Sequence, residues 1–387
     1  MPPAIPAERD LRLDLFRGLA LWLIFLDHIP SNVVSWITIR NYGFSDATEI
    51  FVFISGYTAA FVYGRAMQDR GVVVASARIL RRAWQVYVAH MFLFVIYMAE
   101  IAYVSSTFNN PLYAEEMGVL DFLKQPDITL VQALLLKFKP ANMDVLPLYV
   151  MLLVGFPPVL WLLGRRPTLA VAISFGLYLL SNYFDWNFPA FPSGNWYFNP
   201  LAWQLLFVAG AWCAVVGGAW WERILYSPLT FAAAILYILF AFGVTLTWHV
   251  PGFGRFMPKL LAEWIYPIDK TNLDVLRFVH FAALAVITVQ LVHQDWPGLK
   301  SPLLRPAILC GQHSLEIFCL GVFLAFTGHI VLVEVSDRIS MQVAISALGI
   351  ALMVAVAALI TWYKLMEGRR PGTRPPKMDA DLAGGEA

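Results

Sequence analysis

The first long apolar segment reads Asp14-Leu-Phe-Arg17-Gly-Leu-Ala-Leu-Trp-Leu-Ile-Phe-Leu-Asp27-His28-Ile-Pro30, which predicts a membrane helix with charged groups at both ends. At about 100° per residue, Arg17 and His28 share one face of an α-helix and lie about 16 Å apart along its axis. The hydrocarbon core of a bilayer is about 30 Å thick. If Arg17 marks one edge of that core, His28 lies near its middle.

The composition of the whole chain agrees with a membrane protein. Hydrophobic residues make up 59% of the 387 residues, charged residues only 14%, and the mean hydropathy is +0.65. Soluble domains carry about 25% charged residues. The 27 basic and 26 acidic residues nearly cancel and form no long basic run, so we expect no nucleic-acid partner. The three cysteines lie in or beside apolar stretches with no metal-site spacing, so we expect no bound metal.

Apolar runs of membrane length predict an all-α polytopic protein, a bundle of about ten transmembrane helices. The expected ranges are 17–38, 47–64, 83–105, 145–163, 168–184, 203–218, 229–248, 275–293, 313–334 and 341–363. We divide the chain into a tail over 1–16, one transmembrane domain over 17–364, and a disordered tail over 365–387.

The placement of basic residues orients this bundle. With an even number of spans both termini share one side, and that side holds 18 of the 27 Lys and Arg residues. The positive-inside rule therefore predicts cytoplasmic termini. The opposite side carries three long segments, near 106–144, 185–202 and 249–274, that are rich in Pro, Asn, Asp and aromatic residues.

Asp27 and His28 are the expected chemical centre, because ionisable groups inside a membrane are costly and face the protein interior. Pro30 is expected to kink the helix just beyond them. Asp46 and Glu49 open the second expected helix, which returns toward the depth of His28. We therefore interpret His28 as a general base supported by Asp27 and Glu49. The alternative is that Asp27 and His28 only pair structurally with a neighbouring helix.

A second cluster is expected on the cytoplasmic side. Arg78, Arg81 and Arg82 recur at helical spacing and join Arg17 in a candidate anion site. The alternative is an ordinary positive-inside cluster that touches lipid phosphates.

The loop before residue 200 mixes aromatic rings with amides, a combination that suits a sugar. Its candidate acceptor-binding residues are Asn195, Trp196, Tyr197 and Asn199. The alternative is an aromatic belt at the membrane interface.

Several of these motifs resemble a known family. Arg17 and His28 match the Arg, ten residues, His pattern of the acyltransferase-3 membrane family, Phe51-Val-Phe-Ile-Ser55-Gly56-Tyr57 resembles its second helix, and Arg78-Ile-Leu-Arg81-Arg82 resembles its third signature. Within that clan the chain is most similar to OpgC proteins. The similarity covers Arg12 to Gly64, Asn195-Trp-Tyr-Phe-Asn199-Pro200 with Trp203-Gln204, and Ser314-Leu-Glu-Ile-Phe-Cys-Leu-Gly321.

The resemblance implies an acyltransferase of the bacterial inner membrane, with acyl-CoA, most often succinyl-CoA, as cytoplasmic co-substrate and a periplasmic glucan hydroxyl as acceptor. It implies no permanently bound cofactor. Its implied roles are catalysis by His28 and donor binding by Arg17, Ser55, Arg78, Arg81 and Arg82, while Glu49 corresponds to an acidic position of the family.

Two other interpretations stay open. Ten spans with charges inside the membrane would also serve a transporter or flippase of a glycan or lipid-linked sugar. An acyltransferase could equally act on a lipid or on another exported polysaccharide. The sequence leaves the oligomeric state undetermined.

Overall fold

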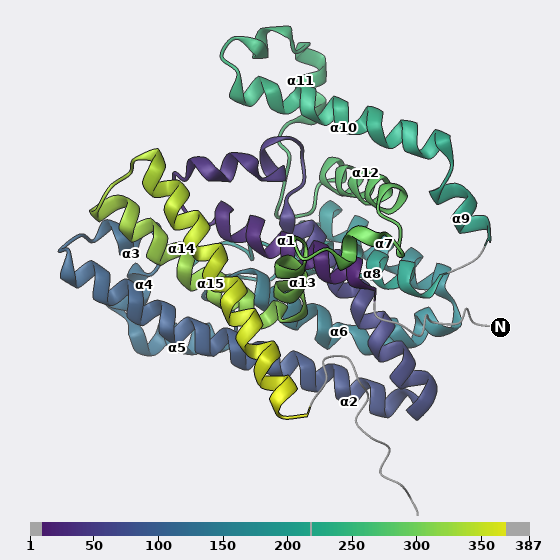
Figure 1. Ribbon diagram of the computed structural model, residues 1–387, viewed down its shortest axis with the longest axis horizontal. Helices are drawn as coiled ribbons and strands as arrows, with labels where there is room; N and C mark the ends of the chain where they lie inside the picture. The colour runs from purple at the N-terminus through teal and green to yellow at the C-terminus, as the bar shows by residue number, and fades with distance from the viewer. Residues whose placement is uncertain (1–9, 217–218, 369–387) are drawn as a thin grey trace, which may run out of the picture.

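The computed structural model describes residues 10–216 and 219–368, which form helices and no named strand (Figure 1). Expectations for the tails at 1–9 and 369–387 therefore concern residues outside those described. The α-helices are α1 (Leu11–Asp27), α2 (Ala47–Thr107), α3 (Leu112–Glu116), α4 (Leu120–Lys124), α5 (Pro126–Leu134), α6 (Val145–Arg165), α7 (Pro167–Tyr183), α8 (Pro200–Val215), α9 (Ala219–Leu225), α10 (Pro228–His249), α11 (Lys259–Ile265), α12 (Val275–Leu291), α13 (Arg305–Gln312), α14 (Ser314–Glu334) and α15 (Ile339–Met366). The 3₁₀ helices are η1 (Val33–Ile37), η2 (Ile39–Asn41), η3 (Phe253–Phe256) and η4 (Pro297–Lys300).

The all-helical fold predicted from the apolar runs is confirmed. Every expected range overlaps a helix, and the ranges 47–64 and 83–105 both fall in α2. Gly71 interrupts α2 with φ 83° and ψ 170°, values that glycine adopts readily because it has no Cβ. The two halves of α2 therefore correspond to two of the expected spans.

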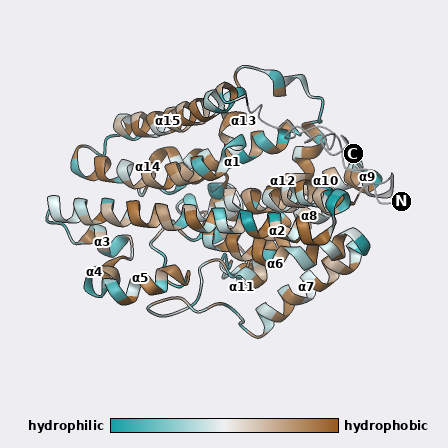
Figure 2. Ribbon diagram, turned by 90° about the horizontal axis from the view of Figure 1, so that it is seen from below, coloured by the Kyte–Doolittle hydropathy of each residue, from teal (hydrophilic) through white to brown (hydrophobic). Residues whose placement is uncertain are grey.

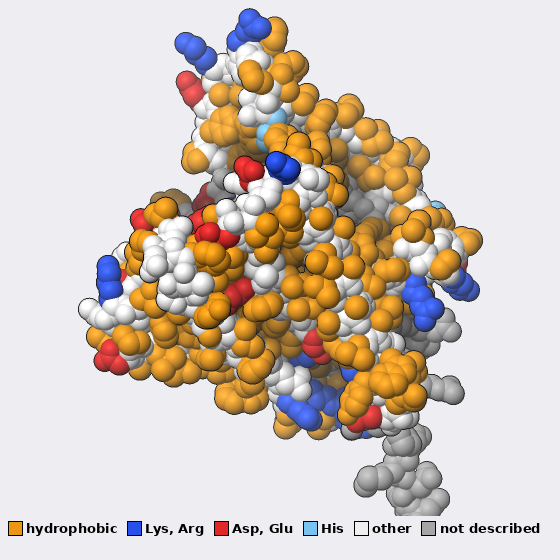
Figure 3. Space-filling model, turned by 60° about the vertical axis from the view of Figure 1, so that its left-hand side comes forward, with side chains coloured by type: hydrophobic (Ala, Val, Ile, Leu, Met, Phe, Trp, Pro, Cys, Tyr) orange, Lys and Arg blue, Asp and Glu red, His pale blue; other side chains and the backbone are white. Residues whose placement is uncertain are grey.

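Within residues 10–216 and 219–368, five helices are long and apolar enough to cross a membrane: α2, α6, α10, α14 and α15. The apolar helices α8 and α12 are shorter. Hydrophobic residues predominate along these ribbons (Figure 2), and hydrophobic side chains cover most of the molecular face in Figure 3. The number of ten crossings and the cytoplasmic position of the termini stay predictions.

The first helix differs from the expected range 17–38. It begins at Leu11, where the Asp10 carboxylate accepts a hydrogen bond from the backbone N–H of Arg12 at 2.9 Å. It ends at Asp27 rather than kinking at Pro30, because Ser31 adopts a positive φ of 56° and the chain continues as η1. His28 is thus the C-cap of α1, at the start of a loop.

Glycines allow the central helices to approach closely. A Cβ on Gly18 of α1 would lie 1.8 Å from the carbonyl oxygen of Ala307 in α13. A Cβ on Gly56 of α2 would lie 1.9 Å from the carbonyl oxygen of Phe207 in α8. Larger side chains at either position would push the helices apart, so close helix packing depends on these two glycines.

The long segments between spans are partly ordered. The range 106–144 contains the short helices α3, α4 and α5, and the range 249–274 contains η3 and α11. In Figure 1, α11 lies at one margin of the molecule beyond α10. Residues from both segments line the largest of the three cavities described below.

Candidate active site

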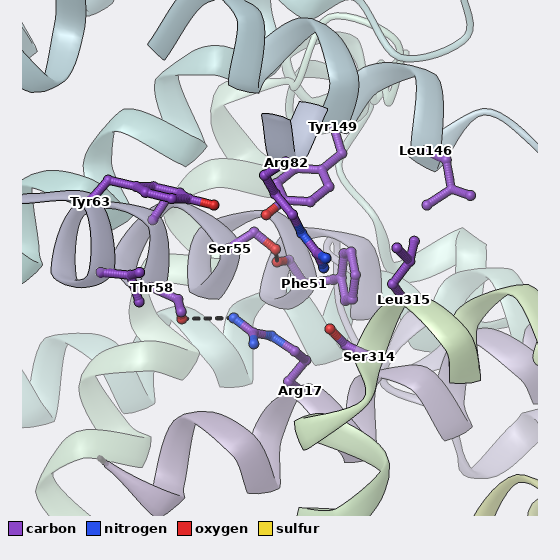
Figure 4. Close-up of a pocket in the computed structure, with 12 residues that line it drawn as sticks. Arg17, Phe51, Ser55, Thr58, Tyr63, Arg82, Leu146, Tyr149, Ser314 and Leu315 are labelled. Atoms are coloured by element: carbon purple, nitrogen blue, oxygen red, sulfur yellow. Dashed lines mark hydrogen bonds between the residues drawn. The ribbon is translucent and has the colours of Figure 1, made fainter. Parts of the chain in front are cut away.

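Arg17 lines a cavity of about 120 Å³, here called the Arg17 cavity (Figure 4). Its guanidinium Nη2 donates to Thr58 Oγ1 at 2.7 Å and to the carbonyl oxygen of Ile54 at 3.2 Å. The polar side chains around this cavity come from α1, α2, α6 and α14: Arg17, Ser55, Thr58, Tyr63, Arg82, Tyr149 and Ser314.

Of the arginine stripe on α2, only Arg82 joins Arg17 at this cavity. In Figure 4 the Arg82 guanidinium points toward the space beside Ser55 and Tyr149. Arg78 and Arg81 are exposed and do not line the cavity. The Ser55 hydroxyl donates to the carbonyl oxygen of Phe51 at 2.7 Å, which fixes its position in the cavity wall. Two cations and several hydroxyls make the Arg17 cavity suitable for an anionic ligand.

His28 lines a larger cavity of about 580 Å³, here called the His28 cavity. The charged groups that line this cavity balance in sign: Asp27, Asp46 and Asp144 against Arg40, Lys270 and Arg277. Volumes of about 300–1,000 Å³ are typical of small-molecule sites.

Asp27 does not bind the neighbouring imidazole. Its Oδ1 accepts a hydrogen bond from Thr38 Oγ1 at 2.8 Å and lies 3.8 Å from Nη1 of Arg40. The loop after α1 therefore holds the Asp27 carboxylate at the edge of the His28 cavity. The recorded contacts of the Asp27 carboxylate are thus with the loop that follows its own helix.

Glu49 is fully buried and belongs to an ion-pair network behind the cavity wall. Its Oε1 lies 2.6 Å from Arg277 Nη2, and its Oε2 accepts the backbone N–H of Asp46 at 2.9 Å. Asp46 Oδ2 lies 2.5 Å from Lys270 Nζ and 3.2 Å from Arg277 Nη2. At the start of the second helix, Asp46 lines the same cavity as His28, whereas Glu49 does not.

The two cavities follow one another along the same three helices. On α2, Thr48 lines the His28 cavity and Phe51, about one helical turn further on, lines the Arg17 cavity. On α6, Val145 lines the His28 cavity and Leu146 lines the Arg17 cavity. Arg17 of α1 lines the Arg17 cavity, and His28, the C-cap of the same helix, lines the His28 cavity. Phe51 and Leu146 are buried side chains at the boundary between the cavities.

A comparison with family models gives a match to OpgC protein over residues 9–365. The chain belongs to the OpgC family. A search of curated proteins and a search of solved structures each gave no match. Family membership and the long apolar helices together support a membrane transferase.

The expected acceptor residues of this OpgC protein are dispersed. Tyr197 lines the His28 cavity, whereas Asn195 is exposed and lies outside it. Trp196 is buried beneath Lys139, whose Nζ lies 4.0 Å from its ring centroid. Asn199 caps α8, accepting from the backbone N–H of Leu201 at 3.0 Å. Only Tyr197 of the four is therefore placed to touch a ligand beside His28.

Asn199 also organises the loops of the OpgC protein near the His28 cavity. Its Nδ2 donates to the carbonyl oxygen of Trp186 at 2.8 Å and to Oδ1 of Asn272 at 2.8 Å. Its backbone N–H donates to the carbonyl oxygen of Thr271 at 3.0 Å. Lys270, which lines the cavity, is adjacent to this anchored segment.

The sequence did not single out Lys270, Arg277 and Asp144 of the OpgC protein as site residues. Arg277 carried a usable signal, because it is an arginine inside an expected span, where charged groups are seldom without function. Lys270 and Asp144 lie in ordinary-looking loop sequence. Only the packing of α6 and α12 against α2 brings them to the cavity of His28.

Proposed function

We propose that this OpgC protein is a membrane-embedded O-acyltransferase that moves an acyl group, succinyl in our hypothesis, from cytoplasmic acyl-CoA to a hydroxyl of a periplasmic glucan. The observation that carries the proposal is the succession of the Arg17 and His28 cavities along α1, α2 and α6. A donor held by cations at one end of this path could present its thioester to the imidazole at the other. Family membership supports the glucan as acceptor.

In the proposed donor site, Arg17 and Arg82 attract the anionic groups of CoA. Guanidinium groups suit phosphate and carboxylate oxygens because they offer several donors in one plane. Thr58 orients Arg17 by accepting its Nη2 hydrogen bond at 2.7 Å. Arg78 and Arg81, exposed beyond the cavity, would meet the more distant phosphates of the nucleotide.

In the proposed transfer step, a neutral His28 imidazole removes the proton from a glucan hydroxyl as the hydroxyl oxygen attacks the thioester carbonyl carbon. The tetrahedral intermediate collapses with cleavage of the carbon–sulfur bond. A new ester forms on the glucan, and the departing CoA sulfur takes the proton from the His28 imidazolium, which restores the neutral imidazole. General-base catalysis of this kind contributes about 10²–10⁴-fold to the rate.

The acceptor would lie in the His28 cavity. Tyr197 and Trp248 offer partly exposed aromatic surface there, at 49% and 44% exposure. Asp27, Asp144 and Lys270 offer charged partners for sugar hydroxyls. An aromatic surface beside a few polar groups is typical of a pocket that orients an amphipathic ligand.

The test uses purified full-length protein in lipid nanodiscs with labelled succinyl-CoA and isolated glucan. Mass spectrometry of the glucan should show ester-linked succinyl groups with the wild-type protein. His28→Ala should lower the rate by about 10²-fold or more. His293→Ala is the matched control, since His293 is exposed and lines neither cavity.

If the wild-type protein gives no covalent product, the transferase proposal fails, and movement of intact glycan across the membrane becomes the better interpretation. Substantial transfer by His28→Ala would contradict the role of His28 as general base and would leave the transferase proposal standing. If other acyl-CoA donors gave product and succinyl-CoA gave none, only the proposed identity of the acyl group would change.

A further inference from the structure

A third cavity adjoins the His28 cavity and is not used by the proposed transfer step. It has a volume of about 450 Å³ and is here called the Trp36 cavity. Its wall is formed by the loop after α1, by η1 and by one residue of α15: Asp27, Ile29, Pro30, Ser31, Asn32, Val33, Ser35, Trp36, Arg40 and Gln342. Asp27 and Arg40 also line the His28 cavity, so the two cavities meet at this pair.

The side chains of Asp27 and Arg40, which line both cavities, lie close to one another. Arg40 Nη1 lies 3.8 Å from Asp27 Oδ1, and the Arg40 side chain is 53% exposed. Because the arginine partner is exposed and the separation is 3.8 Å, a ligand can displace Arg40 from Asp27. Asp27 itself stays in place through the hydrogen bond from Thr38 at 2.8 Å.

The Trp36 cavity has a fixed shape. Asn32 Nδ2 donates to Ser346 Oγ at 3.0 Å, and Gln342 Oε1 accepts the backbone N–H of Val33 at 2.5 Å. These bonds tie the loop to α15. Because the two amides are occupied by protein partners, they shape the cavity, and a ligand would find its polar partners at Ser31, Ser35 and Arg40.

The indole ring of Trp36 is the aromatic group that lines this cavity, and it is exposed. Trp36 is 46% exposed, and its ring meets that of His249 at 4.6 Å between centroids with an interplanar angle of 62°. The neighbouring Trp248 lines the His28 cavity. The end of α10 therefore supports an indole in each cavity. An indole beside hydroxyls, a carboxylate and a guanidinium suits the apolar face and hydroxyl rim of a sugar ring.

We infer that the Trp36 cavity is a second acceptor subsite, which binds the glucose units next to the unit that is acylated at His28. The acceptor then spans the Asp27–Arg40 pair, and the enzyme selects oligomeric glucan over single sugars. This inference rests on the proposed function, which it extends from a single reacting hydroxyl to a binding site for a chain.

The first test measures binding without acyl-CoA, using β-linked gluco-oligosaccharides of increasing length and glucose with purified full-length protein. Affinity should rise once the chain is long enough to reach both cavities. Trp36→Ala should lower the affinity for the long chains by about tenfold, whereas Trp36→Phe should retain most of it. Trp264→Ala is the matched control, because Trp264 is 82% exposed and lines none of the three cavities.

The second test measures acyl transfer to the same acceptors. Trp36→Ala should reduce the ratio of kcat/KM for long acceptors to kcat/KM for glucose by about tenfold, through KM. Arg40→Gln provides a second variant at an exposed position, in case Trp36→Ala does not fold. Equal affinity of the wild type for glucose and for long chains would overturn the subsite. So would indistinguishable results for Trp36→Ala and Trp264→Ala.

The two proposals fail separately. Length-dependent binding that Trp36→Ala abolishes, with no transfer by the wild-type protein, would support the subsite and contradict the transferase. Transfer that depends on His28 but not on acceptor length would support the transferase and contradict the subsite.

Discussion

Arg277 holds its guanidinium against the carboxylate of Glu49, with Nη2 lying 2.6 Å from Oε1 and Nε donating to the same oxygen at 2.8 Å. The two residues are 228 positions apart in the sequence. Glu49 is fully buried, so this pair joins α2 to α12 in the protein interior. Arg277 also reaches Asp46, and it therefore stabilises the wall of the His28 cavity.

We expect Arg277→Ala to lower the free energy of unfolding by about 3–5 kcal/mol, because it leaves a buried carboxylate without its cation. Replacing Arg277 and Glu49 together with Leu should be less damaging than Arg277→Ala alone. Thermal unfolding of the detergent-solubilised protein measures both effects. Arg338→Ala, at an exposed position, is the control. A double variant as unstable as the single one would contradict this account.

The hydrogen bond from Arg17 to Thr58 predicts that a change at Thr58 weakens the binding of the acyl-CoA co-substrate. Thr58→Val keeps the shape of the side chain but removes the oxygen that Arg17 Nη2 contacts at 2.7 Å. Loss of a hydrogen bond to a charged group costs about 1.5–3 kcal/mol, so succinyl-CoA should bind about tenfold or more weakly. Equilibrium binding of labelled succinyl-CoA checks this.

Arg82→Ala should weaken the same donor binding, since Arg82 lines the Arg17 cavity. Arg166→Ala is the control, because Arg166 is exposed at the turn between α6 and α7 and is remote from the cavity lining. If Arg82→Ala and Arg166→Ala bind succinyl-CoA equally well, Arg82 would have no role in donor binding, and the arginine cluster would be an ordinary positive-inside cluster.

Variants of Asn199 and Tyr197 should separate an effect on stability from an effect on acceptor binding. Asn199→Ala removes a helix cap and two further side-chain hydrogen bonds, and a cap alone contributes about 1 kcal/mol, so the Tm should fall. Tyr197→Ala removes a half-exposed ring from the His28 cavity. It should raise KM for the glucan with little change in Tm. A lower Tm without a change in KM for Tyr197→Ala would show that the acceptor binds elsewhere.

Asp144 predicts a pH dependence of stability. Burial raises the pKa of its carboxyl from 3.8 to about 6, against the opposing effect of Lys139 and Lys270. The folded state therefore binds this proton more tightly than the unfolded chain. The stability that the protonated carboxyl contributes is fully present below about pH 4 and is lost as the pH rises through about 6.

Asp144→Asn stays uncharged at every pH. Its Tm relative to the wild type should therefore increase between pH 4 and pH 7, as measured by differential scanning fluorimetry. Asp185→Asn, at an exposed position, is the control. A Tm difference between Asp144→Asn and the wild type that stays constant over this range would show that burial does not control this carboxyl.

Local features of the chain were predictable. Apolar runs predicted helices at every expected range, because a chain in a bilayer must satisfy its backbone hydrogen bonds internally. The end of α1 was predicted less well. The expected range ran to residue 38, but Ser31 turns with φ 56° and the helix stops at Asp27. A positive φ at a serine leaves no clear signal in the sequence.

The cavities were only partly predictable. Arg17, Ser55 and Arg82 share one cavity, and Asp27 and His28 share another with Tyr197. Glu49 was expected beside His28, yet the recorded contacts of its carboxylate are with Arg277 and the backbone of Asp46. The Trp36 cavity was not anticipated at all, since its wall joins a loop near residue 36 to Gln342 of α15.

The sequence by itself determined the membrane character of the chain, the places of its helices and its family, because each depends on composition or on local sequence patterns. Only the tertiary structure decided which partner each charged group takes. Glu49 binds Arg277, Asp46 binds Lys270, and Asp27 binds Thr38. These partners depend on how helices pack across the bundle, and periodicity along a single helix carries no information about contacts with distant segments.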